Sequence, residues 1–400
     1  MHAVKVLQKS LSSVFSVMHA ARARALLGAV SCVIASRRLI LMDLARAWPG
    51  AERVRAPLKC LDRLLSNPHL QQESQGLYAG MARWLLRGER PIIVIDWSDL
   101  QPNGRWYLLR AGVPIGGRTL TLWQEVHAER HKQTALVQRR FLKRLQRLLP
   151  AEVKPILITD AGFERPWFRA VRALGWDYLG RVKGRNRVRV AWGQPLIHVR
   201  ALFAQASAKP QRLHRARLGR LGPWECDLVL YRAAPRGRIR RMRRGQRSHG
   251  RRSVAAERRT HEPWVLATSL EAQQFGCAQI VALYRLRMQI EESFRDLKCE
   301  RFGCAFKYSL TRQGVRLAML LLLHALACFV VWLMGQTLSA SVAGSRYGGV
   351  RSTRARAHYS LLRLGWEALR HHDPCGSPRQ LWATLRRWFT QGTPTLQIST

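Results

Sequence analysis

Hydrophobic positions change their spacing along the chain, and the changes mark different kinds of region. From residue 1 to about 88, apolar residues recur at steps of three and four, as in SRRLILMDLARAW, which predicts short helices. From PIIVIDWSDL onward, short β-branched and aromatic runs alternate with turn dipeptides such as Asn103-Gly104, which predicts strands. Residues 273–335 return to helical spacing, as do two segments beyond residue 355.

The middle of the chain has a definite order of predicted elements. A meander of three strands is followed by a helix, by a strand in VKPILITDAGF, by a second helix and by a further strand in DYLGRVKG. Apolar central strands need cover on their faces. The sequence therefore predicts an α/β fold, in which helices flank a mixed sheet, between helical N- and C-terminal regions.

Residues 186–270 interrupt this core. Their pattern is typical of β-hairpins, as in RVRVAW, WECDLVLYRA and EPWVLATSL. Within them, the arginine-rich residues 232–259 predict a flexible, solvated loop that can settle on phosphates. The predicted organisation is a helical region at 1–88, a core at 89–335 with this β-rich insertion, and a helical region at 336–400. The stripes of Leu and Trp residues in the last region could pack against the rest of the same chain or against a second copy of it.

Charge indicates the class of partner. The chain has 68 Lys and Arg residues against 24 Asp and Glu, a formal net charge of +44, so a polyanion such as the phosphate backbone of DNA is expected. The helices of 1–88 suit DNA binding, although a plain helical bundle would look the same. The 8 cysteines form no CxxC pair, which favours reduced structural thiols over a zinc site or a disulfide framework.

One segment, Leu317–Met334, is apolar enough to span a bilayer, with His324 as its only polar interruption. The alternative is a helix buried at the centre of a large domain, which is apolar all round. The flanking charge is positive on both sides and gives no orientation signal. We expect a buried helix and no membrane contact. The start of the chain shows no signal-peptide pattern, which predicts an intracellular protein.

Two aspartates stand at the ends of apolar runs, Asp96 in IIVIDWSD and Asp160 in PILITDAGF. A carboxylate there costs several kcal/mol of desolvation unless a cation pairs with it. One strand-end aspartate is usually a cap or a turn former. Two at the same end of neighbouring strands would repel each other, and a divalent metal ion resolves this. Asp99, beyond the predicted strand end, and Asp177, at a strand start, do not fit the pattern.

The stretch YRLRMQIEESFRDLK, from Tyr284 to Lys298, predicts one amphipathic helix. With a rotation of about 100° per residue, Glu291 falls at the border of the apolar face, whereas Glu292 points to solvent. The residues in the stripe of Glu291 are Tyr284, Arg287 and Lys298. Taken alone, Arg287 and Glu291 could also be an intrahelical ion pair worth about a few tenths of a kcal/mol.

These residues together resemble the YREK signature of DDE transposases of the IS four insertion-sequence family. The resemblance runs from roughly Arg90 to Lys298 and consists of two strand-end aspartates followed by Tyr, Arg, Glu and Lys at the family's spacing. Position 288 is Met where many members carry Trp, so the local packing must differ. The resemblance implies a ribonuclease-H-like core, with residues 186–270 as the family's β-rich insertion.

The resemblance also implies an activity, cut-and-paste transposition of an insertion sequence. Its catalytic residues and metal ligands would be Asp96, Asp160 and Glu291. They would hold two Mg²⁺ ions, with Mn²⁺ as a substitute, for cleavage and transfer of DNA strands. The implied partners are double-stranded DNA, as terminal inverted repeats and as target, and a second copy of the chain in a DNA-bound homodimer. The implied location is the bacterial cytoplasm, in association with the nucleoid.

Six further residues match DNA-contact positions of the family: Tyr284, Arg287, Lys298, Trp264, Arg181 and Lys183. The first three would grip the phosphate near the cleaved 5′ end. The tryptophan stands where members that cut through a hairpin intermediate hold a flipped base, and a core tryptophan is the alternative. For Arg181 and Lys183, the alternative is that both are ordinary solvated surface residues. For the whole chain, the alternative is a catalytically inactive DNA-binding protein derived from a transposase.

Overall fold

The computed structural model divides the chain into two compact units. The described residues of unit 1 lie within Met1–Pro155 and Met288–Gln397, and those of unit 2 within Ile156–Arg287. The structure describes residues 2–86, 88–101, 104–233, 246, 250, 262–339, 347, 359–371 and 377–390.

Short helices open unit 1, as the helical spacing of the N-terminal sequence predicts. They are α1 (His2–Ser10), α2 (Ser12–Phe15), α3 (Ala20–Ser36), α4 (Leu41–Arg46), α5 (Arg55–Leu65) and α6 (Pro68–Leu85). The start of α6 follows from local chemistry, because Oδ1 of Asn67 accepts a hydrogen bond of 3.0 Å from the Leu70 N–H and Pro68 takes the first helical position. Arg22 of α3 donates to Glu73 of α6 at 2.7 Å and so ties two of these helices together.

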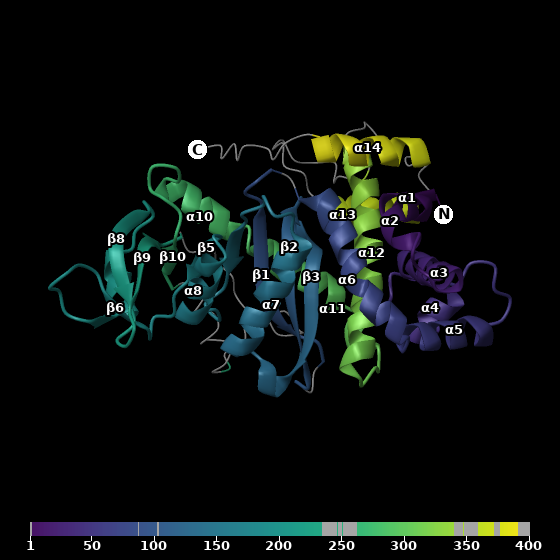
Figure 1. Ribbon diagram of the computed structural model, residues 1–400, viewed down its shortest axis with the longest axis horizontal. Coiled ribbons are helices and arrows are strands. Elements are labelled where there is room, and N and C mark those ends of the chain that lie inside the picture. Colours follow the sequence, from purple (N-terminus) through teal and green to yellow (C-terminus); the bar gives the residue numbers. More distant parts are fainter. Residues whose placement is uncertain are drawn as a thin grey trace. The chain divides into compact units, whose positions relative to one another are not determined.

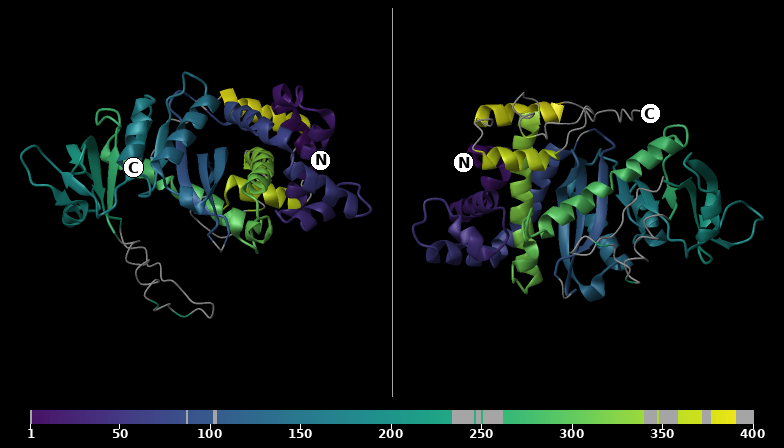
Figure 2. Two further views of the ribbon diagram at one scale, coloured as in Figure 1. Left: turned by 60° about the horizontal axis from the view of Figure 1, so that its bottom comes forward. Right: turned by 180° about the vertical axis from the view of Figure 1, so that it is seen from behind.

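The sheet of unit 1 is antiparallel, with the strand order β3-β2-β1. Its strands are β1 (Ile92–Asp99), β2 (Trp106–Ile115) and β3 (Arg118–Ala128). The turn from β2 to β3 contains Gly116 and Gly117, whose φ angles of 53° and 90° favour glycine. Helix α7 (Ala135–Leu148) covers one face of this sheet and α11 (Met288–Lys298) covers the other (Figures 1 and 2). The sheet is therefore buried on both faces, which explains its nearly continuous apolar strands.

A long helix, α12 (Gly314–Ser339), runs through unit 1. Its most apolar window has a mean hydropathy of 2.5 and is 94% buried. Strand β3 and helix α3 pack along it, and so do α13 (Leu361–Arg370) and α14 (Pro378–Thr390) (Figure 1). Burial on all sides accounts for a helix that is apolar all round. The prediction of a buried helix at Leu317–Met334 is confirmed.

Unit 2 is built on a mixed sheet with the strand order β4-β5-β10-β9-β8-β6-β7. The parallel pair β4 (Ile156–Thr159) and β5 (Asp177–Arg181) is joined by α8 (Arg165–Ala173). The antiparallel remainder is β6 (Arg187–Arg189), β7 (Ile197–His198), β8 (Gln211–Leu218), β9 (Trp224–Tyr231) and β10 (Trp264–Thr268). Helix α10 (Cys277–Arg285) packs on β5 and β9. Three single-turn or short 3₁₀ segments complete the described chain, namely Glu129–His131, Val199–Gln205 and Phe306–Tyr308.

The predicted α/β class is confirmed, because the chain order β1-β2-β3-α7-β4-α8-β5 is the predicted one of a ribonuclease-H-like core. Two features differ from prediction. Strand β8 is not evident in the arginine-rich sequence QRLHRARL, and the helix predicted over YRLRMQIEESFRDLK is two helices, since α10 ends at Arg285 and α11 begins at Met288. Most of the arginine-rich stretch 232–259 lies outside the described residues. The limits 1–88, 89–335, 186–270 and 336–400 stay predictions.

Glycines set the close approach of α12 and α13, and they generate a stability prediction. A Cβ on Gly335 would meet the Leu361 carbonyl, and one on Gly365 would meet the Val331 carbonyl, both well inside van der Waals contact. Gly335→Ala and Gly365→Ala should each lower the free energy of unfolding by about 1–3 kcal/mol, because the backbones must separate.

The matched control is Gly76→Ala in α6, where the added methyl group would lie at an ordinary 3.6 Å from Val14 Cγ1. This change should raise stability by about 0.5–1 kcal/mol through helix propensity. Urea denaturation followed by circular dichroism measures both effects. Equal tolerance of alanine at all three positions would contradict the close packing.

Candidate active site

Asp96 lies within β1 and on the face of the sheet that α11 covers. Its Cα pairs with that of Arg110 on β2, and cross-strand neighbours in an antiparallel sheet share a face. The guanidinium of Arg110 lies 5.3 Å from the ring of Phe294 on α11. Asp96 is only 7% exposed, and its Oδ1 accepts a hydrogen bond of 2.7 Å from the Trp97 N–H. The strand continues to Asp99, so the expectation that Asp96 ends the strand and Asp99 lies beyond it is wrong.

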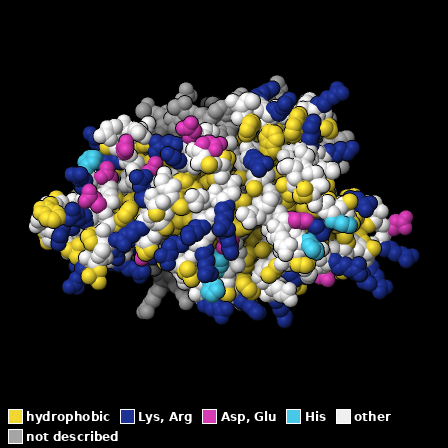
Figure 3. Space-filling view, in the orientation of Figure 1, with side chains coloured by type: hydrophobic (Ala, Val, Ile, Leu, Met, Phe, Trp, Pro, Cys, Tyr) yellow, Lys and Arg dark blue, Asp and Glu magenta, His cyan; other side chains and the backbone are white. Residues whose placement is uncertain are grey.

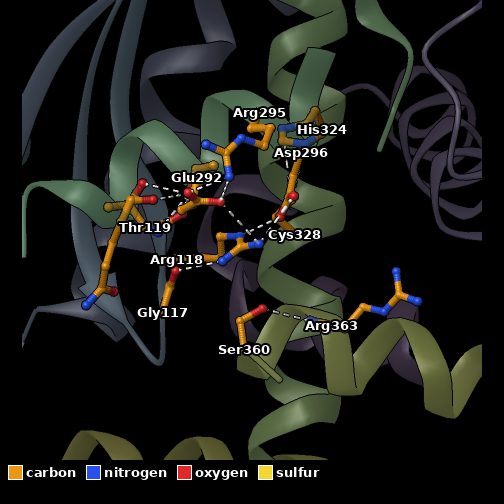
Figure 4. A network of polar contacts seen from close by, with 12 residues as sticks. Gly117, Arg118, Thr119, Glu292, Arg295, Asp296, His324, Cys328, Ser360 and Arg363 are labelled. Carbon is orange, nitrogen blue, oxygen red and sulfur yellow. Dashed lines mark hydrogen bonds and ion pairs between the residues drawn. The ribbon is translucent and has the colours of Figure 1, made fainter. Parts of the chain in front are cut away.

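Helix α11 carries both glutamates, and the structure separates them. The side chains that α11 buries against the sheet are Ile290, Ser293, Phe294 and Leu297. The carboxylate of Glu292 lies 2.6 Å from Arg295 and 3.9 Å from Arg118 of β3 (Figure 4). The expectation that Glu292 simply points to solvent is therefore wrong, because it belongs to an ion-pair network. Glu291 is partly exposed on the helix that covers the Asp96 face.

Lys298, at the end of α11, has a partner that the sequence did not reveal. Its Nζ lies 3.0 Å from Oδ1 of Asp99, the last residue of β1. This pair ties the C-terminal ends of the helix and the strand together. Asp99 is exposed, so the pair contributes little stability and leaves Lys298 able to exchange its carboxylate for a phosphate.

Asp160 lies in unit 2, directly after β4, as predicted. Its Oδ1 accepts a hydrogen bond of 2.8 Å from the Gly162 N–H, which is an ordinary turn-forming contact. In the parallel register Thr159 pairs with Gly180, so Asp160 and Arg181 occupy equivalent positions at the carboxyl ends of β4 and β5. The edge of an α/β sheet at the carboxyl ends of its strands is where ligands commonly bind.

The two predicted basic residues of unit 2 are both paired. Arg181 lies 3.5 Å from Glu262, and Lys183 lies 3.0 Å from Glu164, which precedes α8. These partners come from segments distant in sequence, and no spacing rule in the sequence points to them. The pairs are partly exposed, so the two cations stay accessible to an anion.

Trp264 and Tyr284 are brought together in unit 2. Their ring centroids are 4.9 Å apart with an interplanar angle of 72°, an edge-to-face contact. Tyr284 is 3% exposed and Trp264 is partly exposed at the first position of β10. Arg287, in the turn after α10, has its Cζ 5.8 Å from the Tyr284 ring. The indole is therefore packed against Tyr284 and is still partly accessible.

The predicted residues are divided between the units. Unit 1 holds Asp96, Glu291 and Lys298, and unit 2 holds Asp160, Arg181, Lys183, Trp264, Tyr284 and Arg287. Within the part of the chain that the structure describes, no group of three His, Cys, Asp or Glu side chains is arranged to hold a metal ion. The donor types do fit Mg²⁺, which prefers carboxylate oxygens, and the charge of a buried carboxylate such as Asp96 is stabilised by a cation.

One family model matches most of the chain. The family model described as "Transposase DDE domain" matches residues 87–328. No curated protein matches the sequence. A solved structure, the cryo-EM structure of a piggyBac transposase synaptic complex with hairpin DNA, is similar over 98% of this chain and 84% of that chain. The identity is 12% and the TM-score is 0.43.

The turn at Asp160 allows the carboxylate charge to be removed without loss of the fold. Asp160→Asn keeps an Oδ1 acceptor for the Gly162 N–H and should leave the free energy of unfolding within about 0.5 kcal/mol of wild type. Asp160→Ala loses that hydrogen bond and should cost about 1 kcal/mol. Thermal and urea unfolding measure the difference. If the asparagine variant is as destabilised as the alanine variant, the charge and not the turn contact holds this loop.

Proposed function

Because the chain belongs to the transposase DDE domain family, it is a protein of DNA transposition, and we propose that it cuts and joins DNA strands by metal-dependent phosphoryl transfer. The proposal places it in the IS four group with the YREK signature and the cut-and-paste route. The observation that carries it is the buried carboxylate of Asp96 on the sheet face covered by the helix of Glu291.

The proposed ligands of divalent metal ions are Asp96, Asp160 and Glu291. Bound Mg²⁺ would supply the charge that activates a water or a 3′-hydroxyl and stabilises the leaving oxygen. The chain's own part is to hold the carboxylates on rigid elements: Asp96 inside β1, Asp160 in a hydrogen-bonded turn after β4, and Glu291 on a packed helix. Such preorganisation is what phosphoryl transfer requires of a protein.

The basic surface supports DNA as the substrate. On the face shown in Figure 3, Lys and Arg side chains are spread widely, with few acidic side chains among them. Together with the net charge of +44, this favours many phosphate contacts and a binding constant that falls steeply with salt. We assign the helices of residues 1–88 to the DNA ends, and we propose that two copies of the chain act together on the terminal repeats in the cytoplasm.

Three side chains are proposed to hold the phosphate near the cleaved 5′ end: Tyr284, Arg287 and Lys298. Cations and a phenol bind phosphate oxygens without competing for the metal ions. The partly exposed indole of Trp264, fixed at one edge by Tyr284, is suited to stack on an unpaired base. Arg181 and Lys183 would exchange their present carboxylate partners for DNA phosphates.

The test is DNA cleavage by matched glutamate variants. With Mg²⁺ and a DNA that carries the element's own ends, Glu291→Gln should cut at less than about one thousandth of the wild-type rate, while DNA binding in a gel-shift assay is unchanged. Glu292→Gln should cleave normally, because its carboxylate serves the Arg118 and Arg295 ion pairs.

Two results would overturn parts of the proposal. Loss of cleavage in Glu292→Gln with full activity in Glu291→Gln would show that the wrong glutamate is assigned. A wild-type protein that binds the ends tightly but never cuts them with Mg²⁺ or Mn²⁺ would support the alternative, an inactive DNA-binding protein.

A further inference from the structure

Unit 1 contains a cavity of about 390 Å³ that none of the residues proposed for DNA cleavage lines. Its lining comes from β2, β3, α11, α12 and α13, from the residue that follows α3, and from residues 302–304 and 359–360. Its size lies within the range of about 300–1,000 Å³ of small-molecule sites. Its lining includes four arginines, one carboxylate and one indole, from Arg37, Arg110, Arg118, Arg363, Asp296 and Trp366.

Arg110 is the unusual member of this lining. It is 1% exposed, and its Nε donates a hydrogen bond of 2.9 Å to Oε1 of Gln124. Its Nη2 is buried and has no hydrogen-bond partner among the described residues, and no carboxylate is among the neighbouring groups that shift its pKa. Burial lowers the pKa of Arg110 to about 10, so the side chain is still charged at neutral pH. A buried cation without an anion is costly, and an anionic ligand would compensate it.

A second cation of the cavity has no close ion pair among the described residues. Arg37 stacks over the ring of Trp366 at 4.9 Å, and the Glu367 carboxylate acts on it only as a neighbouring charge. Burial, and then the neighbouring Arg363, lower its pKa. The other two arginines are already neutralised, Arg118 by Asp296 at 2.6 Å (Figure 4) and Arg363 by Glu367 at 2.6 Å.

The rest of the lining suits a phosphate ester better than a bare ion. Hydroxyl groups of Thr121 and Ser360 can donate to phosphoryl oxygens. His324 adds no charge, because burial lowers its pKa to about 3. Trp366 and other apolar side chains leave surface for an organic part that inorganic phosphate would not fill.

We propose that this cavity binds a small phosphorylated organic molecule of the size of a nucleoside monophosphate, with its phosphoryl group between Arg110 and Arg37. The site is separate from the carboxylates proposed for DNA cleavage. Ligand binding in the cavity therefore does not depend on the proposed cleavage activity. The two paired arginines at the cavity orient the anion rather than neutralise it, since their charges are already met.

The experiment uses the full chain without DNA. Isothermal titration calorimetry and thermal shift would be recorded with thymidine monophosphate, inorganic phosphate, sulfate and thymidine. Thymidine monophosphate should bind at one site per chain and raise the melting temperature. Inorganic phosphate should bind more weakly and thymidine not at all.

Variants separate this site from diffuse attraction to a basic surface. Arg37→Gln, at a partly exposed position, should weaken binding by about tenfold or more. Arg110→Met should abolish binding, and it should keep or raise the melting temperature of the ligand-free protein because a buried unpaired charge is lost. Arg312→Gln, an exposed arginine outside the cavity, is the control and should bind as wild type.

Three outcomes would overturn the proposal. These are the absence of saturable binding, binding at many sites that sulfate matches, or binding that Arg37→Gln leaves unchanged. If Arg110→Met fails to fold, Arg110 has a structural role, and Arg37→Gln alone decides the question.

Discussion

The packing of α11 on the antiparallel sheet of unit 1 is the constraint on which the candidate site depends. Ser293 holds the helix to Thr119 of β3, since its Oγ accepts a hydrogen bond of 2.8 Å from the Thr119 N–H. Arg118 pairs with Asp296 at 2.6 Å, and Phe294 lies against Arg110. These contacts fix which side of α11 meets the sheet. Glu291 therefore lies on a rigid helix that covers the sheet face containing Asp96.

The same packing gives the two adjacent glutamates different surroundings. Glu292 pairs with Arg295 of the same helix at 2.6 Å and lies 3.9 Å from Arg118 of β3, next to the closer pair of Arg118 with Asp296. Glu291 is one position away, about 100° around the helix. Of two adjacent identical residues, Glu292 thus lies near Arg118 of strand β3, whereas Glu291 is the one that we propose as a metal ligand.

Local patterns in the sequence were enough for the order of elements and for the location of Asp160 and α12. Local patterns were insufficient where contacts between segments distant in sequence determine the structure. Strand β8 is hidden by its arginines, which form pairs with carboxylates of β9 such as Asp227. The break between α10 and α11 involves neither Gly nor Pro, and Leu286 keeps ordinary helical angles of φ −61° and ψ −22°. The partner of Lys298, Asp99, follows from the fold, because almost two hundred positions separate them.

We propose that Asp96, Asp160 and Glu291 each bind divalent metal ions. The most direct test of this proposal is Mn²⁺ binding, followed by electron paramagnetic resonance, in the full chain bound to a DNA carrying the element's ends. We predict that Asp96→Asn, Asp160→Asn and Glu291→Gln each weaken Mn²⁺ binding by more than about tenfold, whereas Glu292→Gln does not. Unchanged Mn²⁺ binding in any one of the first three variants would contradict it.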